Sequence, residues 1–173
     1  MASSSSCFVV IFMSTLLQFM FVSASTKHID AICQHVTEKE FCVKSLTAYP
    51  PAASATDELK VVKAALDLAK SYAEKSRKFT VKVANENPNL KKQFMECGAS
   101  FQSIIGSLWS ATKELTIDTM TANYDVMVCY DHTRIVKDSI GKNRDEASKT
   151  IMNMTMMMDK LLAIAGGATE LVL

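Results

Sequence analysis

The sequence predicts an all-α protein, an up-down-up-down four-helix bundle preceded by an N-terminal helical hairpin and held by two disulfides. Apolar side chains recur every three or four residues in four long segments, which is the helical period. Glycine and proline are scarce, at 5 and 3 of 173 residues, whereas sandwiches and barrels need many turn residues. Four cysteines remain after removal of an N-terminal targeting segment, and this even number suits disulfides in an oxidising compartment.

The first 24 residues are typical of a secretory signal peptide. Residues 1–26 carry no charged side chain, and Phe8 to Val22 is almost wholly apolar. This stretch of about 15 residues is shorter than the ~20 needed to span a bilayer. Small residues in Val22-Ser23-Ala24 occupy the −3 and −1 positions of a cleavage site after Ala24. We therefore expect a secreted mature chain that starts at residue 25.

Residues 25–52 are predicted to form the helical hairpin. Two short helices fit residues 28–48 around a turn at Val36-Thr37-Glu38, and Pro50-Pro51 ends them. Cys33 and Cys42 flank this turn, so a bond between them would pin it.

Residues 53–173 are predicted to form the bundle. Thr56 or Asp57 can cap its first helix, breaks follow at residues 85–88 and 141–143, and Gly166-Gly167 is expected to cap the last helix. The four apolar stripes are, in chain order, Leu59, Val62, Leu66, Ala69, Ala73, Thr80 and Val83; Phe94, Cys97, Phe101, Ile104, Leu108 and Ala111; Ala122, Val126, Cys129, Thr133, Val136 and Ile140; and Ile151, Met154, Met158, Leu161 and Ala165.

Short connections make consecutive helices antiparallel neighbours. Cys97 and Cys129 lie on the stripes of the second and third bundle helices. If they lie at the same height, the turn falls near their midpoint, at about Lys113–Thr116, with Thr116 or Asp118 capping the next helix. The four cysteines imply two disulfides, and three connectivities are open at this point.

Charge and motifs exclude several classes of function. The chain has 19 Lys+Arg and 18 Asp+Glu, which argues against a nucleic-acid binder and gives no overall attraction to an anionic polymer. It lacks G-x-S-x-G, H-E-x-x-H and phosphate-loop motifs, and its three histidines, His28, His35 and His132, lack metal-ligand spacing. We therefore expect no enzyme activity, no catalytic or metal site, no cofactor, and neither a nucleic-acid nor a membrane partner.

Helical wheels place four candidate partner-binding residues outward on the second and third bundle helices: Trp109, Tyr124, Asp131 and Arg134. Trp109 is the only tryptophan, and an outward tryptophan is a candidate hot spot of a protein interface. The alternative is that Trp109 packs against an adjacent helix or the hairpin.

Asn153-Met154-Thr155 is the only N-glycosylation sequon in the chain. The helical wheel puts Asn153 near the outer face of the last helix. We therefore predict a glycosylation site at Asn153.

Together these features resemble the plant invertase and pectin methylesterase inhibitor family. The resemblance covers nearly the whole mature chain in order and cysteine spacing. The matching segments are Asp30-Ala31-Ile32-Cys33, Cys42-Val43-Lys44-Ser45-Leu46, Pro51, Ser54-Ala55-Thr56-Asp57-Glu58-Leu59, Glu96-Cys97 with Phe101, Leu108, Ala111, Cys129 with Asp131, and Leu161-Leu162-Ala163-Ile164.

The resemblance implies that Cys33 pairs with Cys42 and Cys97 with Cys129. It also implies a secreted inhibitor of the plant apoplast and cell wall. As a monomer in a one-to-one, non-covalent complex, it would block the active-site cleft of pectin methylesterase. The alternatives are an inhibitor of cell-wall or vacuolar acid invertase, or a secreted helical protein without an enzyme target.

Three features depart from the family pattern. The stretch between Cys97 and Cys129 is several residues shorter than usual, and we expect the loss at the turn between the second and third bundle helices. The Pro-Lys-Phe motif that invertase inhibitors often carry in that region is absent, and Tyr130 follows the fourth cysteine where an acidic residue is common. The first two departures favour pectin methylesterase over invertase as the target.

Overall fold

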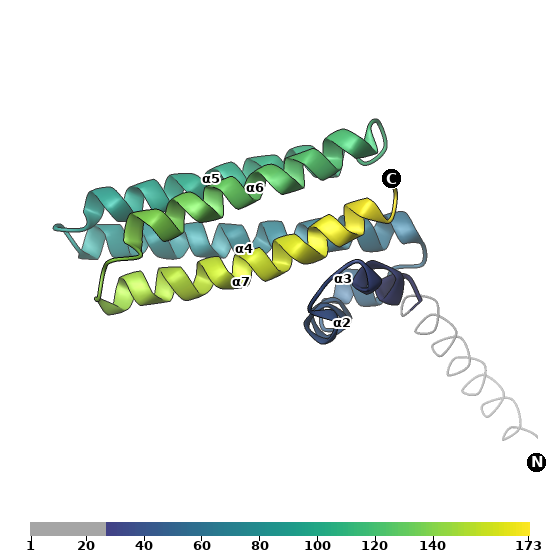
Figure 1. The fold of residues 1–173 in the computed structure, drawn as a ribbon, viewed down its shortest axis with the longest axis horizontal. Helices are drawn as coiled ribbons and strands as arrows, with labels where there is room; N and C mark the ends of the chain where they lie inside the picture. Colours follow the sequence, from purple (N-terminus) through teal and green to yellow (C-terminus); the bar gives the residue numbers. More distant parts are fainter. Residues whose placement is uncertain (1–26) are drawn as a thin grey trace, which may run out of the picture.

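The computed structural model describes residues 27–173, and all regular structure in this range is helical (Figure 1). The predicted signal peptide and its predicted cleavage site after Ala24 lie outside the described residues. Four long helices, α4 (Glu58–Glu86), α5 (Lys91–Glu114), α6 (Thr119–Ile140) and α7 (Glu146–Glu170), form the bundle. Both α4 and α6 pack against α5 and α7, which confirms the up-down-up-down order. Between residues 27 and 173 there is no helix that combines the length and apolarity of a membrane span.

Aspartates begin three of the four long helices. Asp57 accepts a hydrogen bond from the Lys60 backbone N–H at 3.0 Å. Asp118 and Asp145 accept equivalent bonds at 3.1 and 2.8 Å. Each carboxylate satisfies an N–H group that has no partner within its helix, and its charge complements the helix dipole. Asp57 and Asp118 were both among the cap residues predicted from the sequence.

The predicted apolar stripes form the core of the bundle. Every predicted stripe residue of α5 and α6 is buried. On α4, Ser76 fills the gap in the apolar spacing and is also buried, because its hydroxyl donates to the Tyr72 carbonyl oxygen at 2.9 Å. On α7, Thr155 takes the buried position expected of Met154, which is half-buried.

The second hairpin helix ends at Thr47, before Pro50-Pro51, as predicted. The two prolines then start a short helix that was not predicted, α3 (Pro50–Ala53), because proline is tolerated in the first helical turn, where its missing N–H has no partner to lose. One predicted helix end is wrong. Gly166-Gly167 does not cap α7, which continues to Glu170. Neither glycine has a positive φ, and both are buried within the helix.

The N-terminal hairpin consists of a helix at residues 27–34 and α2 (Lys39–Thr47). The disulfide between Cys33 and Cys42 confirms the first predicted pairing, with a Cα–Cα distance of 5.6 Å. The hairpin lies beside the C-terminal half of α7 and the start of α4 (Figure 1). Its turn is tied to α7 by an ion pair of 2.6 Å between Glu38 and Lys160.

The hairpin approaches the bundle closely at Gly167. A Cβ atom added there would lie 2.9 Å from Val36 Cγ2, 3.2 Å from the Ile32 carbonyl oxygen and 3.3 Å from His35 Cβ. The hairpin therefore packs directly on the backbone of α7. Gly166 differs, because no atom lies within 4 Å of a Cβ added to it.

The predicted pairing of Cys97 with Cys129 is not formed, and both cysteines are free and buried. The turn between α5 and α6 lies at residues 115–118, later than the expected Lys113–Thr116. Cys129 Sγ consequently lies opposite Ile104, 3.9 Å from its carbonyl oxygen. Ile104 is seven residues beyond Cys97, which is about two helical turns or roughly 11 Å along the axis. That offset exceeds the Cα separation that a disulfide can bridge.

We predict one disulfide and two free thiols in the mature chain that starts at residue 25. Unfolding in guanidinium without reductant should expose two thiols to Ellman's reagent, whereas a second disulfide would leave none. The native protein should react slowly at pH 8, because burial raises the pKa of Cys97 to about 11 and that of Cys129 to about 12. Few reactive thiolates are then present.

We predict opposite effects for alanine at the two adjacent glycines. Gly167→Ala should lower the free energy of unfolding by about 1–2 kcal/mol, because the new methyl group overlaps the hairpin. Gly166→Ala should raise it by up to ~1 kcal/mol through helix propensity alone. Urea denaturation of both variants measures the change in the free energy of unfolding. Equal stabilisation by the two substitutions would contradict the close packing of the hairpin on Gly167.

Candidate protein-binding site

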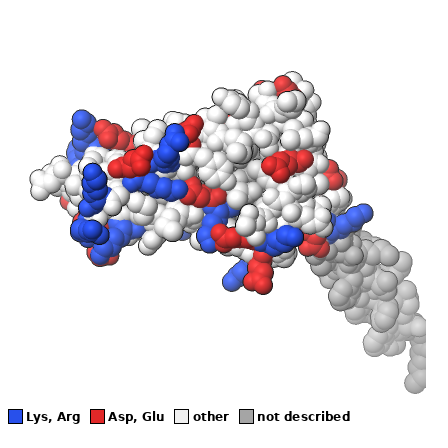
Figure 2. All heavy atoms as spheres, viewed as in Figure 1, with Lys and Arg blue, Asp and Glu red and all other residues white. Residues whose placement is uncertain are grey.

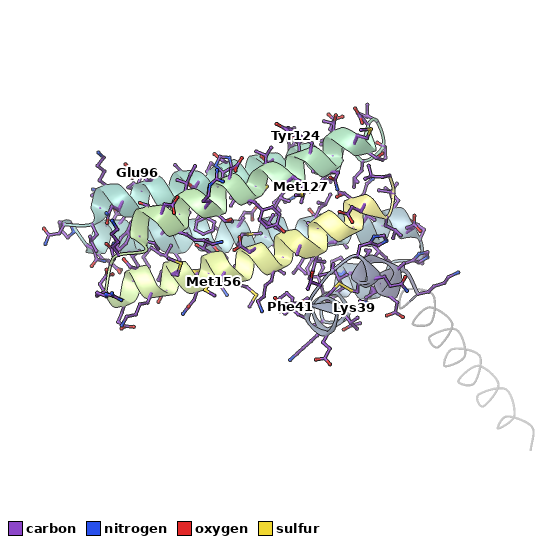
Figure 3. The ribbon with its side chains drawn as sticks, viewed as in Figure 1. Lys39, Phe41, Glu96, Tyr124, Met127 and Met156 are labelled. Carbon is purple, nitrogen blue, oxygen red and sulfur yellow. A yellow bond between two sulfur atoms is a disulfide. The ribbon has the colours of Figure 1, made fainter. Side chains whose placement is uncertain are left out.

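An exposed apolar ridge runs along the outer face of the first half of α6. It consists of Ile117, Met120, Tyr124 and Met127, whose exposed fractions lie between 51% and 77%. Their spacing of three, four and three residues places them on one helix face, and we call this group the α6 ridge. Figure 3 shows Tyr124 and Met127 projecting from α6. Clustered exposed apolar side chains of this kind mark protein interaction surfaces.

The start of α6 holds the ridge in a fixed orientation. Leu115, in the preceding turn, is 3% exposed and anchors the turn in the core. Asp118 accepts hydrogen bonds from the Thr121 hydroxyl at 2.8 Å and the Thr121 N–H at 3.1 Å, which lower the pKa of its carboxyl group. Because the opposite face of α6 is buried, the ridge faces solvent on a rigid element.

The predicted residues Asp131 and Arg134 continue the same face of α6 beyond the ridge. The Asp131 carboxylate and Arg134 guanidinium form an exposed ion pair of 2.9 Å. Such a pair contributes little to folding, so both groups are free to pair with a partner protein. The structure thus brings Tyr124, Asp131 and Arg134 together on one helix face.

Trp109 is exposed, as predicted, but it lies apart from the ridge. Its side chain is 57% exposed, and the Lys113 ammonium lies 5.6 Å from the centre of its ring. On α5, Gly98 faces Thr80 of α4, and Trp109 follows three turns further along the same side of the helix. Trp109 therefore lies on the side of α5 that faces α4, and not on the side that faces α6.

Three residues of the ridge, Ile117, Met120 and Met127, are not among the site residues predicted from the sequence. A signal for them was present, because the apolar spacing of these residues and Tyr124 runs out of phase with the core stripe of α6. Ile117 precedes α6, so the regular spacing of the ridge can be recognised only when the first residue of the helix is known.

Ionisable side chains at the interface between α6 and α7 pair with one another or are partly buried there. Lys137 of α6 forms an ion pair with Asp159 of α7. Burial, together with the Asp159 carboxylate, raises the pKa of Tyr130 to about 12. Tyr130 is therefore protonated at neutral pH and unsuited to act as a base. Within residues 27–173 no cluster of His, Cys, Asp or Glu is arranged to hold a metal ion.

An apolar groove of about 330 Å³ lies between the hairpin and the bundle. Its lining includes Phe41 of α2, Tyr72 of α4 and Met157 of α7. It is open to solvent, and its walls are mostly apolar, so it does not form an enclosed ligand cavity.

The glycosylation sequon lies on the outer side of α7. Asn153 is exposed, whereas Thr155 is buried and its hydroxyl donates to the Ile151 carbonyl oxygen at 2.8 Å. Modification of Asn153 stays a prediction.

Comparisons with known proteins agree with this architecture. The family model described as plant invertase/pectin methylesterase inhibitor matches residues 27–164. A pectinesterase inhibitor from Actinidia deliciosa is 28% identical over 134 residues, covering 76% of this chain and 72% of the relative. Two solved structures share the fold at 22% identity. A mutant form of a pectin methylesterase inhibitor from Arabidopsis has a TM-score of 0.69, and the match covers 82% of this chain and 95% of that chain. A pectin methylesterase inhibitor from Arabidopsis thaliana has a TM-score of 0.59, and the match covers 82% of this chain and 93% of that chain.

Proposed function

Because the chain belongs to the plant invertase/pectin methylesterase inhibitor family, we propose that it is a secreted inhibitor of pectin methylesterase. The relative from Actinidia deliciosa supports this target, since it is described as a pectinesterase inhibitor. A signal peptide over residues 1–24 supports action outside the cell, in the apoplast. The protein itself carries out no catalytic step.

The α6 ridge is the observation that carries the proposed mechanism. Its apolar side chains supply the centre of an interface, and Asp131 and Arg134 supply a polar rim. An interface of standard size buries ~800 Å² on each partner, so the ridge would be its centre rather than its whole extent. The inhibitor would bind non-covalently as a monomer, in a one-to-one complex, and cover the substrate cleft of the enzyme.

Covalent inhibition finds no support in the described residues. The two free thiols are buried, and their raised pKa values keep them protonated at neutral pH. The remaining cysteines in this range form the disulfide of the hairpin. Inhibition should therefore be reversible and should depend on the complementarity of the two surfaces.

An inhibition titration tests the proposed target. The secreted protein is titrated against pectin methylesterases and acid invertases, with enzyme activity as the readout. Loss of esterase activity that saturates near one-to-one, with invertase unaffected, is the expected result. Inhibition of invertase alone would select the alternative target, and a folded protein that inhibits neither would refute the proposal.

We predict that the α6 ridge carries most of the binding energy. Tyr124→Ala and Met127→Ala should each weaken inhibition by roughly tenfold or more, because each removes an apolar contact at the centre of the interface. Met156→Ala is the matched control, since Met156 is similarly exposed but lies on α7. Equal inhibition constants for the ridge variants and this control would remove the ridge from the interface.

Trp109→Ala tests how far the interface extends. Since Trp109 lies on the side of α5 that faces α4, we expect this substitution to weaken inhibition less than the ridge variants do. The free energy of unfolding should stay unchanged. A loss as large as that of Tyr124→Ala would show that the enzyme contacts both α5 and α6.

A further inference from the structure

Four exposed basic side chains gather where the α4–α5 and α6–α7 turns meet. They are Lys91, Lys92, Lys142 and Arg144, and we call this group the basic end. The two turns are joined by Asn143, whose side-chain amide donates to Gln93 Oε1 at 3.0 Å. Gln93 directly follows Lys92, and Asn143 lies between Lys142 and Arg144, so this hydrogen bond joins the two segments that carry the four cations.

None of the four cations of the basic end forms an ion pair with another residue of the described chain. Glu146 is engaged by Lys149 at 2.6 Å, and Asp145 is occupied as the cap of α7. Glu86 lies 3.9 Å from Lys82. These three carboxylates therefore have partners of their own. Glu96 and Asp138, each four residues from Lys92 or Lys142, are exposed and form no ion pair within the described chain.

The two ends of the bundle differ in charge. Figure 2 shows most of the basic side chains of this face, with acidic ones between them, over the end where the α4–α5 and α6–α7 turns lie. The surface over the opposite end of α6 and α7 is almost free of basic side chains in this view. The formal net charge of +1 averages over this uneven distribution. A local positive field can hold a polyanion even when the whole chain is nearly neutral.

A depression of mixed polar and apolar lining adjoins the basic end. Its volume is about 200 Å³, and Asn143, Lys149 and Met152 lie in its lining. The Asn143 amide already donates to Gln93 and Ser148, and Lys149 already donates to Glu146. The Asn143 side-chain oxygen can still accept a hydrogen bond from a sugar hydroxyl, and the remaining N–H groups of Lys149 can donate to a carboxylate.

We propose that the basic end binds polyuronate, a polysaccharide whose uronic acid units carry free carboxylates. The choice of polymer rests on the proposed function: hydrolysis of a methyl ester of pectin leaves a carboxylate on the chain. The product of the inhibited enzyme is therefore a polyanion, whereas its fully esterified substrate is neutral. The cations of the basic end complement the product and not the substrate.

The position of the basic end allows it to act together with the α6 ridge. α5 has 24 residues and spans roughly 36 Å, with Lys91 at its start and the turn leading to the ridge after its end. The two surfaces therefore lie at opposite ends of the bundle. The inhibitor can be held on de-esterified polymer while its ridge remains available to the enzyme.

Retention of the secreted protein on immobilised polygalacturonate, without enzyme present, tests the proposal. Fully methyl-esterified pectin and double-stranded DNA are the comparison matrices. We expect retention on polygalacturonate that falls with rising salt and little retention on the esterified polymer. The variant K91Q/K92Q/K142Q/R144Q should bind polygalacturonate roughly tenfold more weakly or worse.

A matched variant, K27Q/K39Q/K44Q/K63Q, loses the same number of charges from the other end of the molecule and should retain binding. Equal losses in the two variants, equal retention on esterified pectin, or stronger retention on DNA would each overturn the proposal. Inhibition titrations of the same proteins separate the two proposals. A protein that binds polygalacturonate but inhibits no esterase would refute only the proposed function.

Discussion

The turn at residues 115–118 fixes the register between α5 and α6, and the rest of the candidate site depends on it. Leu115 holds the turn in the core, and Asp118 starts α6 directly after it. This register sets Cys129 opposite Ile104, two turns away from Cys97. It also turns the α6 ridge to solvent, because the core stripe of α6 must face α5 and α7.

The bundle separates two surfaces of different chemistry. The α6 ridge is apolar and adjoins the α5–α6 turn, whereas the basic end is polar and lies at the far ends of the same helices. An apolar surface binds a partner by burial, and a charged surface attracts a polyanion over a longer range. A rigid rod of four helices keeps these two modes of binding apart.

The hairpin is attached to the bundle by close packing rather than by chain connection alone. Gly167 allows Ile32 and Val36 to rest on the backbone of α7, and the disulfide between Cys33 and Cys42 keeps the hairpin turn in shape. An ion pair between Glu38 and Lys160 adds a second tie across the same seam. Together these contacts make the hairpin part of one folded unit with α4 and α7.

The sequence by itself determined the helical class, nearly all of the four core stripes and two of the three capping aspartates, Asp57 and Asp118, as one of two candidates each, because helical periodicity and caps are local signals. The pairing of Cys33 with Cys42 came from the family resemblance. Only the tertiary structure decided the register of α5 against α6, and hence that Cys97 and Cys129 remain free. A shift of two residues in a turn leaves the stripes unchanged but displaces facing side chains. The structure also decided that Gly166-Gly167 continues a buried helix. From the sequence, a glycine that lets a neighbouring helix pack closely cannot be distinguished from a glycine that ends the helix in which it lies. The gathering of Lys91, Lys92, Lys142 and Arg144 is likewise invisible in a net charge of +1, because residues 50 positions apart meet only when the bundle folds.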